Sequence, residues 1–200
     1  MFWSRSRHNR SRVIMALVAT ILSLAPFGVL RAEGEAPKVG DTAADFELRS
    51  VLGNPVRLSE TLKSGKVVLV VLRGYPGYQC PLCHRQVAEL IKSADQFQKA
   101  GAQVLLVYPG PPKNLAARAR EFIDQKEIPK NFTLLLDPQF KFTLSYGLRW
   151  EAPNETAYPS TFVLEEKTGK IIYALVSKTH GGRAPTADVL KAVEQSAGAN

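Results

Sequence analysis

The stretch from Lys66 to Leu90 constrains the fold of this chain more than any other, because it joins three structural signals in a fixed order. It begins with the apolar, β-branched run Val67–Leu72 and continues through a turn rich in Gly, Pro and Tyr. It then reaches Cys80-Pro-Leu-Cys83, which holds the only two cysteines in the chain, and enters a segment with helical apolar periodicity. The pattern predicts a buried strand, a loop, and a helix that begins beside two thiols.

The start of that helix gives the two cysteines different environments. Pro81 lacks an N–H and has a fixed φ, so it suits the first helical position and leaves Cys80 at the N-cap. Unpaired backbone N–H groups and the helix dipole favour an anion there, and they can lower a thiol pKa from roughly 8.5 to about 3.5–7.5. Cys83 lies about one turn further along. We therefore predict Cys80 as the nucleophile and Cys83 as the resolving thiol.

Two structural interpretations of the cysteine pair compete with a redox role. A structural disulfide between these residues would close a very small loop, and the stabilisation from loop closure grows with loop length. A zinc site needs four ligands, whereas one C-x-x-C supplies two. His84 and His180 are the only histidines after residue 32, and their spacing does not match a Cys2His2 site. We predict no metal.

A third alternative is covalent haem attachment, because Cys80-Pro-Leu-Cys83-His84 satisfies the C-x-x-C-H pattern. His84 would then be the proximal ligand, and His180 the distal one because no methionine follows residue 32. The alternating strands and helices do not resemble a small helical cytochrome. No glycine-rich phosphate loop links a strand to a helix, so we expect no organic cofactor either.

The rest of the chain alternates strand and helix patterns. A hairpin is expected over residues 46–58, with its turn at Gly53-Asn-Pro55, followed by a helical turn at 59–62. Further strands are predicted at 67–72, 104–108, 132–136, 158–165 and 171–177. Helices are predicted from the cysteines to Gly101, then at 111–125, 139–146 and 186–196, and residues 148–157 are expected to form a surface loop. This order predicts an α/β fold with a mixed central sheet and helices on both faces.

The first 32 residues have the pattern of a secretory signal peptide. Four arginines without an acid precede the apolar run Val13–Leu30, and Ala32 is a small residue at a suitable cleavage point. An uncleaved anchor is the alternative, and only then do we expect contact with a membrane. Export would place the protein in the periplasm or another extracytoplasmic compartment, where disulfides persist.

Removing residues 1–32 changes what the charge implies. The formal net charge of +8 falls to +3, because this segment carries five basic residues and no acid. The remaining chain has no stripe of Lys and Arg interleaved with aromatic residues. We therefore expect no nucleic-acid partner.

Several motifs together resemble a thioredoxin-fold redoxin of the alkyl hydroperoxide reductase/thiol-specific antioxidant (peroxiredoxin-like) family. They are KVGDTAADFEL, GNPVRLSE, VVLVVLRG, CPLC and YPSTFVLEEKTGKI. The resemblance implies a thioredoxin-like domain over residues 38–198, after a linker at 33–37. It also implies that Pro159 is a cis proline facing the dithiol and that the backbone of Tyr158 pairs with substrate.

The chain also departs from that family. The peroxidase stretch Pro-x-x-x-Thr-x-x-Cys has Arg73 in place of its proline and Gly77 in place of its threonine. The arginine that the family sets at the late strand is absent, so Arg73 or Arg149 is the auxiliary candidate. The predicted function is an exported thiol–disulfide oxidoreductase that acts on a protein disulfide and is regenerated by an external dithiol. A thiol peroxidase that reduces hydroperoxides is the alternative.

Overall fold

A computed structural model describes residues 1–3, 34–124 and 127–195. The predicted signal segment lies outside the described residues except for its first three. Among the described residues, no helix is both long enough and apolar enough to cross a bilayer.

The described part of the chain forms a seven-stranded mixed sheet with the strand order β2-β1-β5-β4-β3-β6-β7. Strands β3, β4 and β5 run parallel, and the remaining neighbours pair antiparallel. The predicted N-terminal hairpin is confirmed as β1 and β2, and β1 adds to the sheet beside β5. The strands are β1 (Glu47–Ser50), β2 (Pro55–Arg57), β3 (Lys66–Val71), β4 (Ala102–Gly110), β5 (Phe132–Pro138), β6 (Ser160–Leu164) and β7 (Ile171–Val176).

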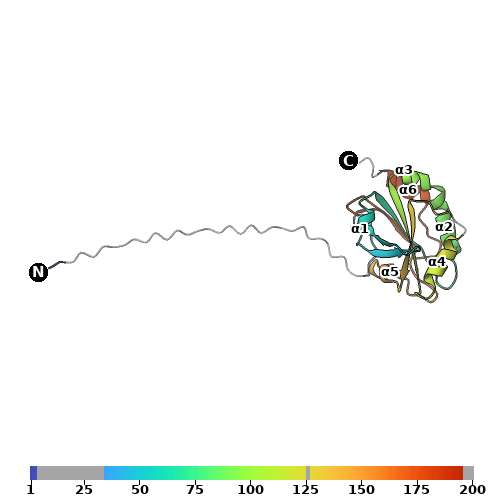
Figure 1. The fold of residues 1–200 in the computed structure, drawn as a ribbon, viewed down its shortest axis with the longest axis horizontal. Helices are drawn as coiled ribbons and strands as arrows, with labels where there is room; N and C mark the ends of the chain where they lie inside the picture. Colours follow the sequence, from blue (N-terminus) through green and yellow to red (C-terminus); the bar gives the residue numbers. More distant parts are fainter. Residues whose placement is uncertain (4–33, 125–126, 196–200) are drawn as a thin grey trace. The chain divides into compact units, whose positions relative to one another are not determined.

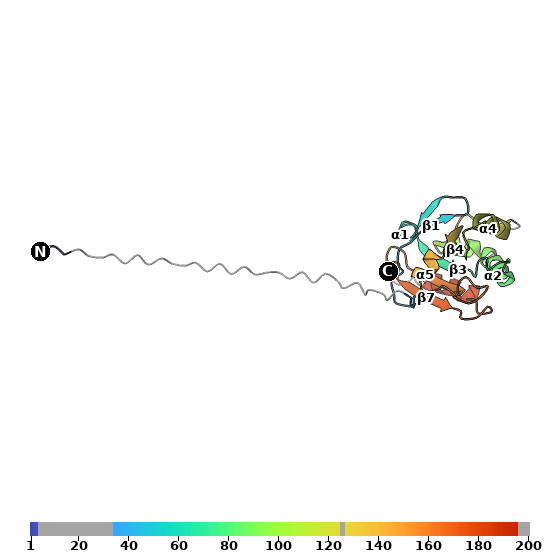
Figure 2. The same cartoon turned by 90° about the horizontal axis from the view of Figure 1, so that it is seen from below.

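Helices cover both faces of the sheet, as predicted. Helices α1 and α5 lie on one side, and α2 and α4 lie on the other (Figures 1 and 2). Helices α3 and α6 pack on the same side as α2. The helices are α1 (Leu58–Thr61), α2 (Pro81–Lys92), α3 (Ala94–Lys99), α4 (Leu115–Ile123), α5 (Lys141–Ser145) and α6 (Thr186–Gln195).

Strand β3 lies between two hydrophobic cores, which explains its uninterrupted apolar sequence. Val68, Val70 and the following Leu72 face the core beneath α2, α3, α4 and α6. Val67, Leu69 and Val71 face the core beneath α1 and α5, and all six side chains are fully buried. Each such side chain contributes about 1.5–3 kcal/mol on burial. The end of β3, and therefore the loop that leads to the cysteines, is held firmly in place.

Three details of the predicted secondary structure were wrong. The helix after the cysteines is interrupted at Ser93, whose φ of −103° and ψ of 14° are not helical, so α2 and α3 are separate. Helix α4 begins at Leu115 rather than at the prolines, because Asn114 adopts a left-handed φ of 64°. The loop 148–157 is not confined to the surface. Leu148, Thr156 and Ala157 are at most 1% exposed, and an isolated bridge pairs Arg149 with Ala157.

Candidate active site

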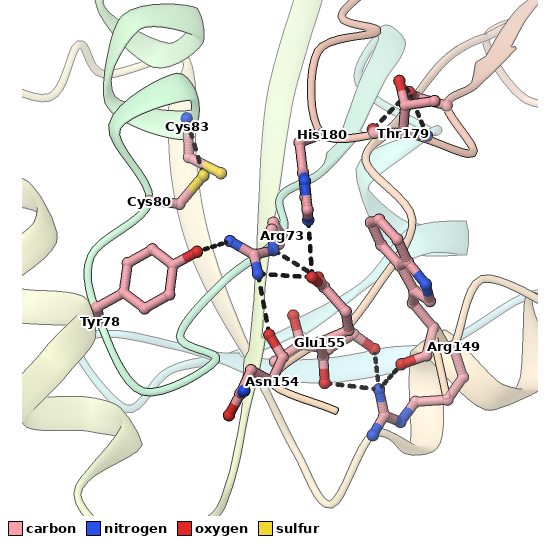
Figure 3. Close-up of polar contacts among 12 residues, drawn as sticks. Arg73, Tyr78, Cys80, Cys83, Arg149, Asn154, Glu155, Thr179 and His180 are labelled. Carbon is pink, nitrogen blue, oxygen red and sulfur yellow. Dashed lines mark hydrogen bonds and ion pairs between the residues drawn. The ribbon is translucent and has the colours of Figure 1, made fainter. Parts of the chain in front are cut away.

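The two cysteines meet at the first turn of α2, as predicted. Cys80 is the N-cap residue with an extended backbone, and Pro81 occupies the first turn. The backbone N–H of Cys83 donates to Cys80 Sγ at 3.4 Å (Figure 3). Both cysteines are free thiols, with Cys80 3% exposed and Cys83 fully buried. The helix start therefore directs the Cys83 N–H at the Cys80 sulfur, and both sulfurs are covered.

The environments of the two thiols separate their pKa values. A hydrogen bond from the Cys83 thiol, assisted by the Cys83 backbone N–H and the charges of Arg183 and Arg73, lowers the pKa of Cys80 to about 5 despite its burial. The same hydrogen bond to Cys80 and its own burial raise the pKa of Cys83 well above the ordinary value. At neutral pH, Cys80 is therefore a thiolate, and its sulfur accepts a hydrogen bond from the Cys83 thiol.

Arg183 is a site residue that the sequence analysis missed. It lies beyond β7, in the segment that leads to α6, and its Nη2 atom is 4.0 Å from Cys80 Sγ and 3.8 Å from Cys83 Sγ. The only signal in the sequence was a basic residue after Gly181-Gly182 in a loop next to a predicted strand end. Its guanidinium places one positive charge next to both sulfurs, although Arg183 is about a hundred residues from the two cysteines along the chain.

Arg73 is buried at the end of β3 and forms an ion pair with Glu155, a residue that the sequence analysis did not select. Arg73 Nε is 2.5 Å from Glu155 Oε2, and the two side chains are 5% and 8% exposed. Arg73 also donates to Glu155 Oε1, to the carbonyl oxygen of Asn154 and to the Tyr78 hydroxyl (Figure 3). Burial acts to raise the pKa of Glu155, but hydrogen bonds from Arg73 and His180 hold it below the ordinary value. The carboxylate is charged.

Arg149, the other auxiliary candidate, contacts a different set of atoms. Its Nη1 donates to the carbonyl oxygens of Trp150, Glu155 and Thr156, and its guanidinium lies 4.2 Å from the centre of the Phe140 ring. In Figure 3 it lies on the side of Glu155 away from the cysteines. Arg149 therefore shapes the loop that carries Glu155, while Arg73 and Arg183 contribute charge near the thiols.

Pro159 and Tyr158 directly precede β6. The described residues contain no cis peptide bond, so the cis proline expected from the resemblance was wrong. Pro159 is buried, and its carbonyl accepts the Ser177 N–H at 2.9 Å. The Tyr158 N–H donates to Leu148 O, and its carbonyl accepts from the Ser160 hydroxyl. The backbone of Tyr158 is already hydrogen-bonded within the protein, and a substrate-binding role for these two residues stays a prediction.

The two histidines considered as ligands lie in different surroundings. The His84 ring packs 4.4 Å from the Phe122 ring, and His180 Nε2 lies 2.7 Å from Glu155 Oε1. Within residues 1–3, 34–124 and 127–195, no group of three or more His, Cys, Asp or Glu side chains could hold a metal ion. The geometry thus describes a pair of thiols with two nearby arginines.

Comparisons with known proteins show the family and the fold of this chain. Residues 39–174 match the AhpC/TSA family. Thiol-disulfide oxidoreductase ResA of Geobacillus thermodenitrificans is 28% identical over 178 residues, which cover 85% of this chain and 92% of that protein. Putative peroxiredoxin MT1643 of Mycobacterium tuberculosis is 32% identical over 114 residues, which cover 56% of this chain and 67% of that protein. The crystal structure of peroxidoxin BcpB from Mycobacterium tuberculosis superposes with a TM-score of 0.61 at 26% identity, covering 80% of this chain and 97% of the other.

Proposed function

This chain belongs to the AhpC/TSA family of thioredoxin-like redoxins, and we propose that it is a thiol–disulfide oxidoreductase whose redox pair is Cys80 and Cys83. One observation carries the proposal. The Cys80 sulfur lies at the start of α2, accepts the Cys83 N–H at 3.4 Å, and lies 4.0 Å from the Arg183 guanidinium. These contacts favour a thiolate, and the thiolate is the nucleophile in disulfide exchange.

In the first step, the Cys80 thiolate attacks one sulfur of a substrate disulfide. A Cys80–substrate S–S bond forms, the substrate S–S bond breaks, and the other substrate sulfur leaves as a thiolate. That leaving thiolate can take up the proton that Cys83 holds, because the pKa of Cys83 is raised while it faces an anionic Cys80 and falls once that charge is gone.

In the second step, the Cys83 thiolate attacks Cys80 Sγ and displaces the substrate as a second thiolate. The substrate has gained two electrons, and the enzyme holds a Cys80–Cys83 disulfide. An external dithiol then reduces this disulfide and is itself oxidised. Arg183 lies within 4.0 Å of both sulfurs, so the same guanidinium can stabilise whichever sulfur is anionic.

Cysteine variants test the assignment of the two thiols. Insulin reduction by the dithiol-regenerated enzyme should be abolished in Cys80→Ser. The Cys83→Ser variant should accumulate a covalent adduct with substrate, visible on non-reducing gels and released by dithiothreitol. Retention of activity in Cys80→Ser, or trapping through Cys83 in that variant, would overturn the proposal.

A thiol peroxidase is the second candidate, and the burial of the nucleophile favours it. Cys80 is only 3% exposed, and a hydroperoxide needs far less room than a protein disulfide. The thiolate would attack the peroxide oxygen, forming a Cys80 sulfenic acid and releasing an alcohol or water. Cys83 would then form the disulfide and release water. Rates of hydrogen peroxide consumption far above that of a free thiol would support this reaction, and rates equal to a free thiol would exclude it.

We further propose that residues 1–32 direct export and that the redoxin domain, residues 38–198, works in the periplasm or another extracytoplasmic compartment. The arginine-rich start, the apolar run and Ala32 support this proposal. Fractionation of expressing cells, with mass spectrometry of the N-terminus, tests it. A protein found in the cytoplasm with Met1 intact would contradict it.

A further inference from the structure

The segment Ser177–Arg183, here called the arginine loop, carries Arg183 from the end of β7 to the sulfurs. The Ser177 N–H donates to the Pro159 carbonyl at 2.9 Å, and the Ser177 hydroxyl donates to the Thr179 carbonyl at 2.7 Å. At the other end, Arg183 Nη1 donates to the His180 carbonyl at 2.9 Å. The position of the Arg183 guanidinium therefore depends on where His180 lies.

Glu155 holds His180 in place. Its Oε1 atom lies 2.7 Å from His180 Nε2, and the same carboxylate receives two hydrogen bonds from Arg73 at 2.5 and 2.7 Å. Arg73 is buried at the end of β3, so this carboxylate is tied to the centre of the sheet. The His180 ring also packs 4.9 Å from the Trp150 ring. An unbroken set of contacts runs from β3 through Glu155 and His180 to Arg183.

We propose that Glu155 is a positioning residue for the redox pair, because it clamps His180 and thereby keeps the Arg183 guanidinium at the two sulfurs. Within the proposed function, on which this inference rests, Glu155 touches neither sulfur and acts only through the arginine loop. This role differs from that of Arg73, whose own charge lowers the pKa of Cys80.

The direction in which the Cys80 pKa changes when Glu155 is removed distinguishes this positioning role from a direct electrostatic effect of the carboxylate. As a negative charge near the thiols, Glu155 disfavours the Cys80 thiolate, so its removal alone would lower the pKa of Cys80. Its removal would also leave the Arg73 charge unpaired, which acts in the same direction. If Glu155 instead keeps Arg183 in place, its removal lets a positive charge move away from the sulfur, and the pKa of Cys80 rises.

The test is Glu155→Gln in the reduced, folded protein, with the Cys80 pKa measured from the ultraviolet absorbance of the thiolate. We expect the acid dissociation constant of Cys80 to fall about tenfold, because the loss of the Arg183 charge about 4 Å away outweighs the opposing effect of the Arg73 charge, which acts on Cys80 more weakly. A tenfold smaller acid dissociation constant makes the reduced form less stable. The reduction potential of the two-electron Cys80–Cys83 couple therefore becomes about 30 mV more negative, which equilibration in glutathione buffers measures. A lowered or unchanged pKa would overturn the inference. The exposed acid variant Glu60→Gln is the control and should change neither quantity.

The double variant Glu155→Gln with Arg183→Gln sharpens the test. Without the Arg183 side chain there is no charge for Glu155 to position, so only its direct electrostatic effect remains. Adding Glu155→Gln to Arg183→Gln should therefore lower the pKa of Cys80 instead of raising it. The same rise in both backgrounds would show that Glu155 acts without Arg183 and would overturn the inference.

Variants of the arginine loop test the same point without removing the buried carboxylate, which matters if Glu155→Gln does not fold. A Cβ added at Gly182 would lie 2.4 Å from Ser177 Oγ and 3.0 Å from Ser177 Cβ, whereas one at Gly181 meets no atom within 4 Å. Gly182→Ala should displace the loop and raise the Cys80 pKa, and Gly181→Ala is the matched control. His180→Phe, which keeps the ring beside Trp150, should act like Gly182→Ala. Unchanged pKa values in both would overturn the inference. If Cys80 and Cys83 form no reversible disulfide in the unsubstituted protein, the proposed function itself is refuted.

Discussion

The two halves of this active site differ in how they are built. The start of α2 is local: Cys80, Pro81 and Cys83 are neighbours in sequence, and the helix alone brings the thiols together and supplies the N–H contact. The charged half is assembled from the end of β3, the loop 148–157 and the arginine loop, which lie up to about a hundred residues apart. A local motif can thus bring two thiols together at the start of a helix. The charges that tune them come from segments that look like ordinary surface loops.

The largest expected effect concerns the reactivity of the local half. Alkylation of reduced Cys80 by iodoacetamide should follow a pH profile with its midpoint at about 5, while Cys83 stays unmodified at neutral pH. A thiol with an ordinary pKa of about 8.5 is only about 3% ionised at pH 7, so the two cysteines should differ widely in labelling. Mass spectrometry of the peptides measures it. In urea both cysteines should react alike, and equal labelling in the folded protein would contradict the division of roles.

The next largest effect concerns the charged half. Arg73→Leu should lower the free energy of unfolding by about 3–5 kcal/mol, because it leaves the buried Glu155 carboxylate without its main partner. Urea unfolding measures this value. Lys63→Gln, which breaks an exposed pair with Glu60, is the matched comparison and should cost about 0–1 kcal/mol. Similar losses in both variants would show that the Arg73–Glu155 pair behaves like a surface contact.

An effect of similar size to that of Arg73→Leu is expected from the pH dependence of stability. In the reduced protein, the pKa of Cys80 is lowered from 9.0 to about 5, so between these pH values the unfolded chain binds a proton that the folded chain has released. The stability contributed by this thiolate is fully present above pH 9 and is lost as the pH falls through 5. The urea midpoint of the reduced protein should therefore rise from pH 5 to pH 8. The rise should be clearly shallower in Cys80→Ser, and equal slopes would contradict the lowered pKa.

The smallest effect tests which hydrogen-bond partner holds the Arg73 guanidinium in place. Tyr78→Phe removes one acceptor from Arg73, but the bonds to Glu155 and to the Asn154 carbonyl remain. Tyr78 is half exposed, so water can replace its hydroxyl. We expect a loss of no more than about 1 kcal/mol in urea unfolding and an unchanged Cys80 pKa. A loss as large as that of Arg73→Leu would show that Tyr78, rather than Glu155, secures this arginine.

Much of the fold could be predicted because the relevant signals are short-range. The run Val67–Leu72 is apolar on both faces, which is typical of a central strand, and Pro81 marks the first turn of a helix. The break at Ser93 had no such signal, because nothing in the neighbouring sequence interrupts the apolar periodicity. The loop 148–157 is predicted at the surface because its sequence follows neither a strand nor a helix pattern, yet its ends turn inward and its Glu155 side chain is buried against Arg73.

The sequence by itself determined the start of a helix beside two thiols and the order of strands and helices, since these depend on contacts within one turn or on alternation along one strand. Only the tertiary structure decided which charges surround the thiols. Arg183 and Glu155 carry no local pattern, and a loop charge is buried only when a partner of opposite sign is brought to it. That pairing is set by how β3, β6 and β7 lie side by side in the sheet, and it becomes visible only in three dimensions.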